Sequence, residues 1–253
     1  LLPTMQAKIY HDMIQITNLQ KNYSGATVLD IPDLTITEGD IFGLVGNNGA
    51  GKTTLFSLVL DLIRASKGKV LINETAVAQS EEWKAQTGAY IDESFIIGYL
   101  TPDEYFNFIG ELRGMNSNDT AGFLKSFDEF FNGEIIGKKK LIRDLSKGNQ
   151  KKVGVVGAFM GNPGVVILDE PFANLDPSSQ YQLRKIIKEF AADRQKIMLI
   201  SSHDLDHVTD VCNRIVILEK GKIVRDVVKT DSTLAELEEF FTGVKSPVSY
   251  FDE

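Results

Sequence analysis

A glycine-rich segment with an embedded lysine is the part of this sequence that most directly suggests chemistry. Residues 46–53 read Gly-Asn-Asn-Gly-Ala-Gly-Lys-Thr and match the spacing G-x-x-x-x-G-K-[ST] of a phosphate-binding loop. Glycines let a backbone turn tightly enough to aim several N–H groups at one anion. Lys52 would add a positive charge for the β- and γ-phosphates, and the Thr53 hydroxyl would reach a Mg²⁺ ion. The segment therefore predicts a nucleoside triphosphate site.

Two acidic residues follow an apolar run that has the composition of a buried strand. Residues 165–168 are Val-Val-Ile-Leu, and Asp169 and Glu170 come directly after them. Acids at the end of a buried strand are costly unless they have partners. A Mg²⁺ ion for Asp169 and an attacking water for Glu170 would supply those partners. Together with the phosphate loop, the two acids indicate a nucleoside triphosphatase.

The elements expected to position these residues alternate between strands and helices. Strand-like patterns occupy residues 14–45 and 70–91, and further strands are expected at 165–168, 197–201 and 215–218. The phosphate loop falls between a strand and a helix, which is the context that the motif requires. Further helices are expected from residue 177 and over residues 204–212. The alternation predicts an α/β fold.

The stretch 92–150 between two strand-rich parts is expected to be helical. It carries phenylalanines that we interpret as helix-packing core, namely Phe106, Phe108, Phe123, Phe127, Phe130 and Phe131. The same region leads into a basic cluster made of Lys138, Lys139, Lys140, Arg143, Lys151 and Lys152. We interpret this cluster as a solvated face rather than a nucleic-acid site, because the whole chain carries a net charge of −8.

Composition excludes several classes of protein. The chain has 253 residues, of which 43% are hydrophobic and 25% charged, as in a folded globular protein rather than a disordered or fibrous one. A single cysteine, Cys212, excludes a disulfide framework within the chain and a zinc site built on several thiolates. Apolar stretches stay well short of the roughly 18 residues of a membrane span, and the first residues lack a signal-peptide pattern. We therefore expect a soluble intracellular protein.

Several further patterns occur in an order that resembles one family. Residues 145–149 read Leu-Ser-Lys-Gly-Asn and resemble the signature motif of ABC-type ATPases, and residues 173–176, Ala-Asn-Leu-Asp, resemble their D-loop. His203 stands where the family has its switch histidine, and Tyr23 where it has an aromatic residue that stacks on adenine. From about residue 14 to residue 221 the chain is thus similar to the nucleotide-binding subunit of an ABC transporter.

This resemblance implies a fold and a division of the chain. The fold is a P-loop NTPase core with an N-terminal antiparallel β-subdomain and an inserted α-helical subdomain at about residues 92–150. A single ABC ATPase domain would occupy residues 14–245. Residues 1–13 would be an N-terminal extension and residues 246–253 a C-terminal tail.

The resemblance also implies roles for individual residues. The ATP-binding set would be Tyr23, Gly46, Asn47, Asn48, Gly49, Ala50, Gly51, Lys52, Thr53 and Thr54. Glu170, His203 and Lys52 would be catalytic, and Thr53, Asp169 and Asp92 would hold Mg²⁺. In this family two domains dimerise head to tail, as a homodimer or heterodimer. Ser146, Lys147, Gly148 and Asn149 would then face the partner's ATP, beside Asp176 of the D-loop.

The sequence departs from the family pattern at three positions. Asp92 stands where a glutamine usually joins the core to the helical insertion, and its neighbour Glu93 could substitute for it. Lys147 replaces a glycine of the signature, and Asn149 replaces a glutamine. These variants look most like exporters of antibiotic- and drug-resistance type.

The resemblance implies an ATPase that powers transport, with export as the expected direction. It would act through separate transmembrane permease subunits at the inner face of the cell membrane, without nucleic acid as a partner. Two alternatives remain. One is a non-transport ABC ATPase of translation or DNA repair, and the other is a regulatory ATP-binding module without turnover.

Overall fold

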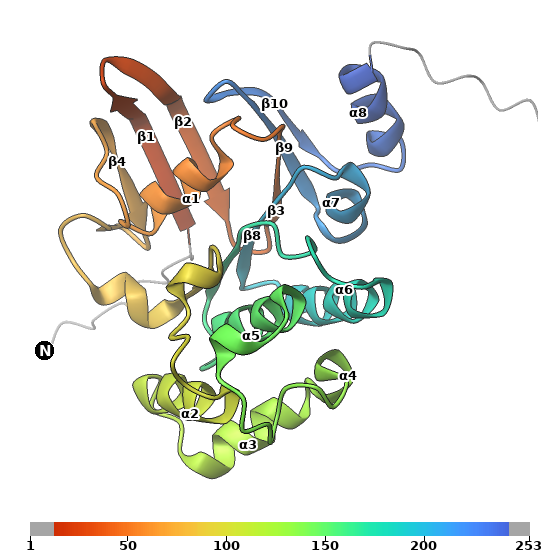
Figure 1. The fold of residues 1–253 in the computed structure, drawn as a ribbon. Coiled ribbons are helices and arrows are strands. Elements are labelled where there is room, and N and C mark those ends of the chain that lie inside the picture. Colours follow the sequence, from red (N-terminus) through yellow and green to blue (C-terminus); the bar gives the residue numbers. More distant parts are fainter. Residues whose placement is uncertain (1–12, 243–253) are drawn as a thin grey trace, which may run out of the picture.

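The computed structural model describes residues 13–242, which form two β-sheets with helices packed around them (Figure 1). Residues 1–12 and 243–253 lie outside the described part of the chain. The expected C-terminal tail and the expected N-terminal extension, apart from Met13, therefore lie outside it too.

The first sheet is antiparallel and contains the beginning of the described chain. Its order is β2 (Ala26–Thr37), β1 (Met13–Tyr23), β4 (Lys67–Ile72) and β5 (Thr75–Ala76). Along β1 the apolar Ile14 and Ile16 are buried while Gln15 between them is partly exposed, the alternation of a sheet with one covered face. The expected antiparallel β-subdomain is confirmed.

The second sheet holds the strands that precede the predicted site residues. Its order is β10 (Lys222–Val228), β9 (Arg214–Glu219), β3 (Ile41–Val45), β8 (Ile197–Ser202), β7 (Val165–Leu168) and β6 (Thr87–Tyr90). The strands from β9 to β6 pair in parallel, and β10 pairs antiparallel with β9. This is the α/β core of a P-loop NTPase.

Two hydrophobic cores lie on opposite faces of the second sheet. Phe42 and Leu44 of β3 pack in one core with the first sheet and with α1 (Lys52–Val59). Ile41 and Val45 pack in the other. That second core contains residues of α5 (Lys147–Phe159), α6 (Pro177–Ala191) and α7 (Leu205–Val211). Because both faces are covered, the strands are continuously apolar, as in buried parallel sheets.

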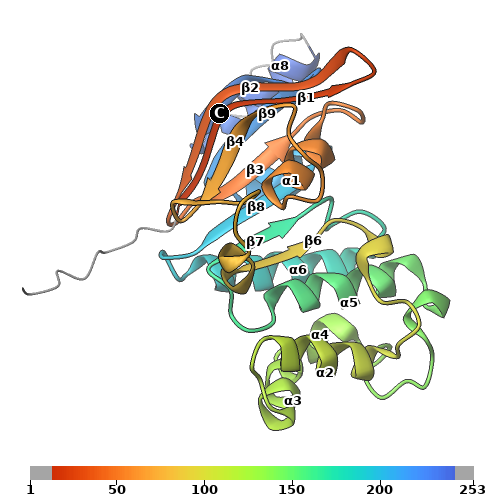
Figure 2. The same cartoon turned by 90° about the vertical axis from the view of Figure 1, so that its left-hand side faces the viewer.

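The helical insertion lies between β6 and α5 in the chain. It consists of α2 (Pro102–Leu112), α3 (Ser117–Lys125) and α4 (Asp128–Phe131). In both views these helices gather at the end of the molecule away from the first sheet, with α5 and α6 in between (Figure 2). Short 3-10 turns occupy Glu82–Gln86, Glu93–Phe95 and Ile142–Asp144, and α8 (Thr233–Thr242) ends the described chain.

The expectation that residues 92–150 are helical is wrong for several short segments, of which residues 132–141 are the longest. This segment carries no regular helix or strand among the described residues. Asn132, Gly133 and Gly137 have φ values of 52°, 66° and 74°, in the left-handed region that ends a right-handed helix. Glycine and asparagine tolerate that region, and the chain therefore turns here.

Two expectations about side-chain burial also fail in part. Phe106, Phe130 and Phe131 are fully buried, but Phe108 is 41% exposed. Two positions along a helix correspond to a rotation of about 200°, so Phe106 and Phe108 of α2 cannot both face the core. In the basic cluster, Lys151 and Lys152 are only 5% and 3% exposed, because α5 packs both of them inward.

Candidate nucleotide-binding site

The order of the strands brings the predicted site residues together. The phosphate loop follows β3, His203 follows β8, and Asp169 and Glu170 follow β7. These three strands are parallel neighbours in the order β3, β8, β7, so their carboxyl ends lie at one edge of the sheet. Ligands of open α/β sheets bind at this edge.

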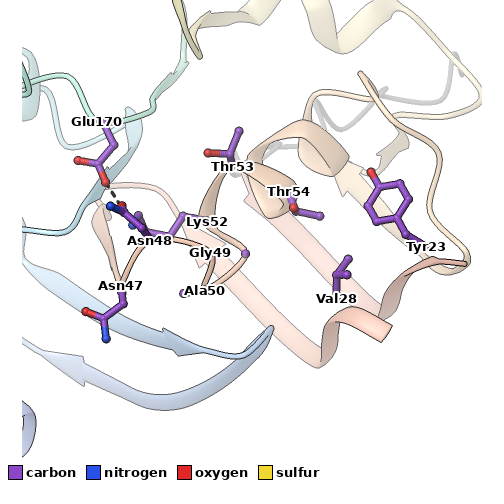
Figure 3. A pocket seen from close by; sticks show the side chains of 11 residues that line it. Tyr23, Val28, Asn47, Asn48, Gly49, Ala50, Lys52, Thr53, Thr54 and Glu170 are labelled. Atoms are coloured by element: carbon purple, nitrogen blue, oxygen red, sulfur yellow. Dashed lines mark ion pairs between the residues drawn. The ribbon is translucent and has the colours of Figure 1, made fainter. Parts of the chain in front are cut away.

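The phosphate loop lines a pocket of about 340 Å³ (Figure 3). The lining residues are Tyr23, Val28, Asn47, Asn48, Gly49, Ala50, Gly51, Lys52, Thr53, Thr54 and Glu170. Gly51 has a φ of 109° and directly precedes α1, whose first residue is Lys52. The pocket therefore faces the N-terminal end of a helix, where free N–H groups and the helix dipole favour an anion.

Gly46 is the predicted loop residue that does not line this pocket, and close packing explains its identity. A Cβ atom at Gly46 would lie 2.4 Å from the backbone oxygen of Leu218 on β9. A larger residue would push the loop away from the sheet. Gly46 thus fixes where the loop begins.

Lys52 is buried and contacts both the loop and the predicted hydrolytic acid. Its Nζ atom donates a hydrogen bond to the backbone oxygen of Gly46 at 2.6 Å. It also lies 3.2 Å from Oε1 of Glu170, the ion pair drawn in Figure 3. The ammonium group therefore lies where the phosphates of a nucleotide would meet both the loop and Glu170.

Glu170 is held from several sides in an uncommon backbone conformation. Its φ is 47°, the left-handed region that costs a non-glycine residue about 1–2 kcal/mol. Its N–H group donates to Oγ of Ser201 at 2.9 Å, and its Oε2 atom lies 2.8 Å from Nδ1 of His203. Strained conformations that surrounding contacts maintain are concentrated at functional sites.

Asp169 and Thr53 supply the oxygen atoms that a magnesium ion prefers. Thr53 Oγ1 donates to Oδ2 of Asp169 at 2.5 Å, and the Ser201 hydroxyl donates to Oδ1. Burial raises the pKa of the Asp169 carboxyl, against the opposing effect of these two hydrogen bonds. A cation would offset the cost of burying the Asp169 carboxylate. Mg²⁺ prefers oxygen ligands, and here a hydroxyl and a carboxylate lie next to the phosphate loop. These residues fit the ion.

Tyr23 lies at the end of the pocket opposite Glu170 (Figure 3). Its ring is 49% exposed, and Nζ of Lys21 lies 4.7 Å from the ring centroid. An exposed ring face next to a phosphate loop is available for stacking on a flat base.

Asp92, Glu93 and Lys147 line a second hollow, separate from the phosphate pocket. Oδ1 of Asp92 accepts the N–H of Ser94 at 2.6 Å and caps the 3-10 turn that follows. The structure therefore does not bring Asp92 into the lining of the phosphate pocket. Its expected contact with Mg²⁺ stays a prediction.

The signature residues lie at the start of α5, next to the D-loop. Ser146 is the N-cap, and its Oγ accepts the N–H of Asn149 at 3.2 Å. A Cβ at Gly148 would come within 2.9 Å of the Asn174 oxygen. Asp176 caps α6 by accepting the N–H of Ser179 at 3.0 Å. Ser146 and Asn149 line a third hollow together with the lysines 138–140, so the signature lies outside the phosphate pocket of its own chain.

Three residues of this region were not expected from the sequence. Val28 lines the pocket from β2, and nothing in its residue type distinguishes it from a core valine. Ser201 bridges Asp169 and Glu170, and its position at the end of a predicted strand was the available signal. Lys151 donates to the backbone oxygen of Glu170 at 2.7 Å, but the sequence suggested a solvated lysine.

Comparison with known proteins identifies the family. The model of the ABC transporter family matches residues 29–173. An uncharacterized ABC transporter ATP-binding protein of Methanocaldococcus jannaschii is 38% identical over 213 residues, which cover 83% of this chain and 76% of that protein. The lipopolysaccharide export system ATP-binding protein LptB of Haemophilus influenzae is 35% identical over 211 residues, covering 82% of this chain and 87% of that protein.

A solved structure supports the same fold. The dimeric structure of a post-hydrolysis state of an ATP-binding cassette, bound to ADP and Pi, aligns with a TM-score of 0.74 and 20% identity over 85% of this chain and 98% of that one. The chain belongs to the ABC transporter family and is an ATP-binding domain with ATPase activity. The expected family and fold are confirmed. Within residues 13–242, every helix falls short of the length and apolar character needed to cross a bilayer.

Proposed function

We propose that this chain is the ATP-hydrolysing subunit of an exporter, in which two such domains drive separate membrane subunits. The observation that carries the catalytic part is the position of Glu170, whose two carboxylate oxygens lie 3.2 Å from Lys52 and 2.8 Å from His203. A carboxylate between a phosphate-binding lysine and a histidine is well placed to orient water for attack on a γ-phosphate.

Residues at the two ends of the pocket bind different parts of ATP. Tyr23 stacks on the adenine, and the loop N–H groups with Lys52 bind the phosphates. Glu170 holds the attacking water, and His203 contacts the γ-phosphate. Thr53 and Asp169 would hold Mg²⁺, which when bound supplies positive charge against the β- and γ-phosphates.

The arrangement of the signature favours a site shared between two chains. Ser146 lies at the N-terminal end of the 13-residue helix α5, an end that attracts phosphate, yet it faces a hollow distinct from that of Lys52. A head-to-tail dimer would place Ser146, Lys147, Gly148 and Asn149 against the γ-phosphate of the partner's ATP. ATP then stabilises the closed dimer, and hydrolysis removes that preference.

Transport partners are proposed from the family and from the relatives' names. The export system to which LptB belongs supports export as the direction. The chain would lie in the cytoplasm on the inner face of the membrane, bound to permease subunits, without nucleic acid as a ligand. Pull-down of tagged Glu170→Gln protein from native membranes with Mg-ATP should co-purify a stoichiometric polytopic membrane protein. Co-purification of ribosomes or repair factors instead would contradict a transport role.

Two substitutions separate ATP binding from hydrolysis. Glu170→Gln should abolish turnover while it keeps ATP affinity and favours an ATP-stabilised dimer, because the amide fits but is a poor base. Lys52→Ala should weaken ATP binding by about 10- to 100-fold, the effect of losing hydrogen bonds from a charged donor. ATPase assays, calorimetry and size-exclusion chromatography measure these outcomes, with the exposed Lys84→Ala as control. Turnover at the parent rate in Glu170→Gln would refute the role of Glu170.

A further inference from the structure

Lys151 is a buried charged residue for which the proposed mechanism has no role. It lies on α5 and is 5% exposed. Its Nζ atom lies 5.6 Å from the centroid of the Tyr90 ring and donates to the backbone oxygen of Glu170 at 2.7 Å. Burial lowers the pKa of the Lys151 ammonium, and the charges of Glu93, Glu170 and Asp169 oppose that change. A buried ammonium is retained only where it has such partners.

The contact with Lys151 fixes one side of the Glu170 main chain. On the other side, the N–H of Glu170 donates to Oγ of Ser201 at 2.9 Å. The backbone oxygen of Glu170 also accepts a hydrogen bond from the N–H of Ala173 at 3.3 Å, which is longer than the bond from Lys151. Because φ of Glu170 is 47°, relaxation toward an ordinary conformation would swing its carboxylate away from Lys52 and His203.

The Tyr90 ring lies beside the Lys151 side chain and is held there by its own contacts. Its backbone oxygen accepts the N–H of Asp169 at 2.8 Å, and its hydroxyl donates to Oε1 of Glu93 at 3.1 Å. Gly154, one turn after Lys151 on α5, leaves room for the ring, because a Cβ there would lie 2.3 Å from Cδ2 of Tyr90. The ammonium is thereby confined between a ring and the peptide that it holds.

We propose that Lys151 is a positioning residue for ATP hydrolysis: its ammonium group holds the main chain of Glu170 so that the carboxylate stays beside Lys52 and His203. The inference rests on the proposed role of Glu170. It links the start of the signature helix to the hydrolytic carboxylate within one chain. Lys151 itself does not touch the nucleotide.

The test replaces the donor without emptying the site. Lys151→Met keeps the length of the side chain and removes the hydrogen bond, so kcat should fall at least about tenfold while KM for ATP stays within about twofold. Lys151→Gln is shorter but keeps an N–H donor and should recover part of the lost kcat. ATP-binding stoichiometry and thermal melting, measured on each variant, report the fraction of folded protein.

The matched control is the neighbouring lysine on the same helix. Lys152 is 3% exposed, and its Nζ lies 5.6 Å from the ring centroid of Phe130 rather than on Glu170. Lys152→Met therefore removes an equally buried charge and should keep kcat within about threefold. Parent-level kcat in Lys151→Met, or an equal loss in Lys152→Met, would overturn the proposal.

Two further measurements keep the outcome interpretable. If Lys151→Met does not fold, Lys151→Ala is assayed with and without propylammonium, and kcat must rise with the amine; no rise overturns the proposal. Glu170→Gln is assayed in parallel. Turnover in Glu170→Gln would refute the assignment of Glu170, whereas loss there with normal turnover in Lys151→Met would refute only the role of Lys151.

Discussion

At the scale of single residues, the proposed mechanism makes Glu170 and the γ-phosphate of ATP compete for Lys52. Lys52 is 6% exposed, so its attraction to Glu170 at 3.2 Å is only weakly screened by water. A γ-phosphate bound to Lys52 would weaken this pair and would leave the Glu170 carboxylate available to water and to His203. The ion pair thus holds the Glu170 carboxylate beside Lys52.

His207 illustrates a histidine with a structural role near the same site. Its ring stacks on Phe172 with centroids 4.6 Å apart and an interplanar angle of 24°. Burial lowers the pKa of His207 below its ordinary value of 6.5, although Asp204 at 3.7 Å opposes this effect. The folded state therefore prefers the neutral ring.

This preference predicts an acid-dependent loss of stability. Below about pH 6.5 the unfolded chain binds a proton at His207 that the folded chain does not, so the free energy of unfolding falls as pH decreases toward the folded-state pKa. His207→Phe keeps a stacked ring and removes this effect. Urea unfolding of both proteins between about pH 7.5 and 5.5 should show a shallower decline for the variant. Parallel curves would contradict the prediction.

At the scale of elements, the contact between β6 and α5 depends on glycines. A Cβ atom at Gly88 of β6 would lie 1.8 Å from the backbone oxygen of Ala158 on α5. Backbone cannot give way as a flexible side chain does, so the helix and the strand pack this closely only because position 88 lacks a side chain. This contact sets the distance between α5 and the strand next to Asp169.

Gly88→Ala should therefore destabilise the fold by about 1–3 kcal/mol, the usual cost of overpacking. Gly122→Ala is the matched control, because a Cβ at this position of α3 would meet no described atom within 4 Å apart from its chain neighbours and the backbone of its own helix. Alanine there should stabilise the helix by about 0.5–1 kcal/mol. Urea denaturation of the two variants measures both effects. Equal effects would mean that the close approach at Gly88 does not matter.

At the scale of the whole molecule, two hollows are separate. The phosphate pocket and the hollow lined by Ser146 and Asn149 share no lining residue. In the proposed mechanism each chain would carry two half-sites, one with Lys52 and one with Ser146. A head-to-tail dimer of such chains would contain two composite sites. The proposed mechanism therefore predicts a complementation that a self-contained site could not give.

The experiment mixes two chains that are each inactive. Lys52→Ala lacks the phosphate-loop half, and Ser146→Asp keeps a good N-cap for α5 while it repels a γ-phosphate. Random pairing makes about half of the dimers mixed, each with one intact composite site, so the mixture should recover up to about a quarter of the parent ATPase rate. No recovery at concentrations that support the dimer would refute a shared site.

The amino-acid sequence alone predicted the phosphate loop, the acids after β7 and the α/β class. These features are local: loop spacing, a short apolar run and a glycine that begins a helix follow from neighbouring residues. The boundaries Val165–Leu168 and the start of α6 at Pro177 agree with expectation, because β-branched residues and a proline mark them clearly.

Features that depend on contacts between distant segments could be seen only in the folded protein. The strand order β3, β8, β7 brought His203, Ser201 and Glu170 together, and no local pattern encodes strand order. The burial of Lys151 has the same origin: a lysine in a run of basic residues resembles a solvated one. It is buried because α5 packs against β6 and β7. This packing places the ammonium group beside the Tyr90 ring and on the backbone oxygen of Glu170, which lies 19 residues away in the sequence.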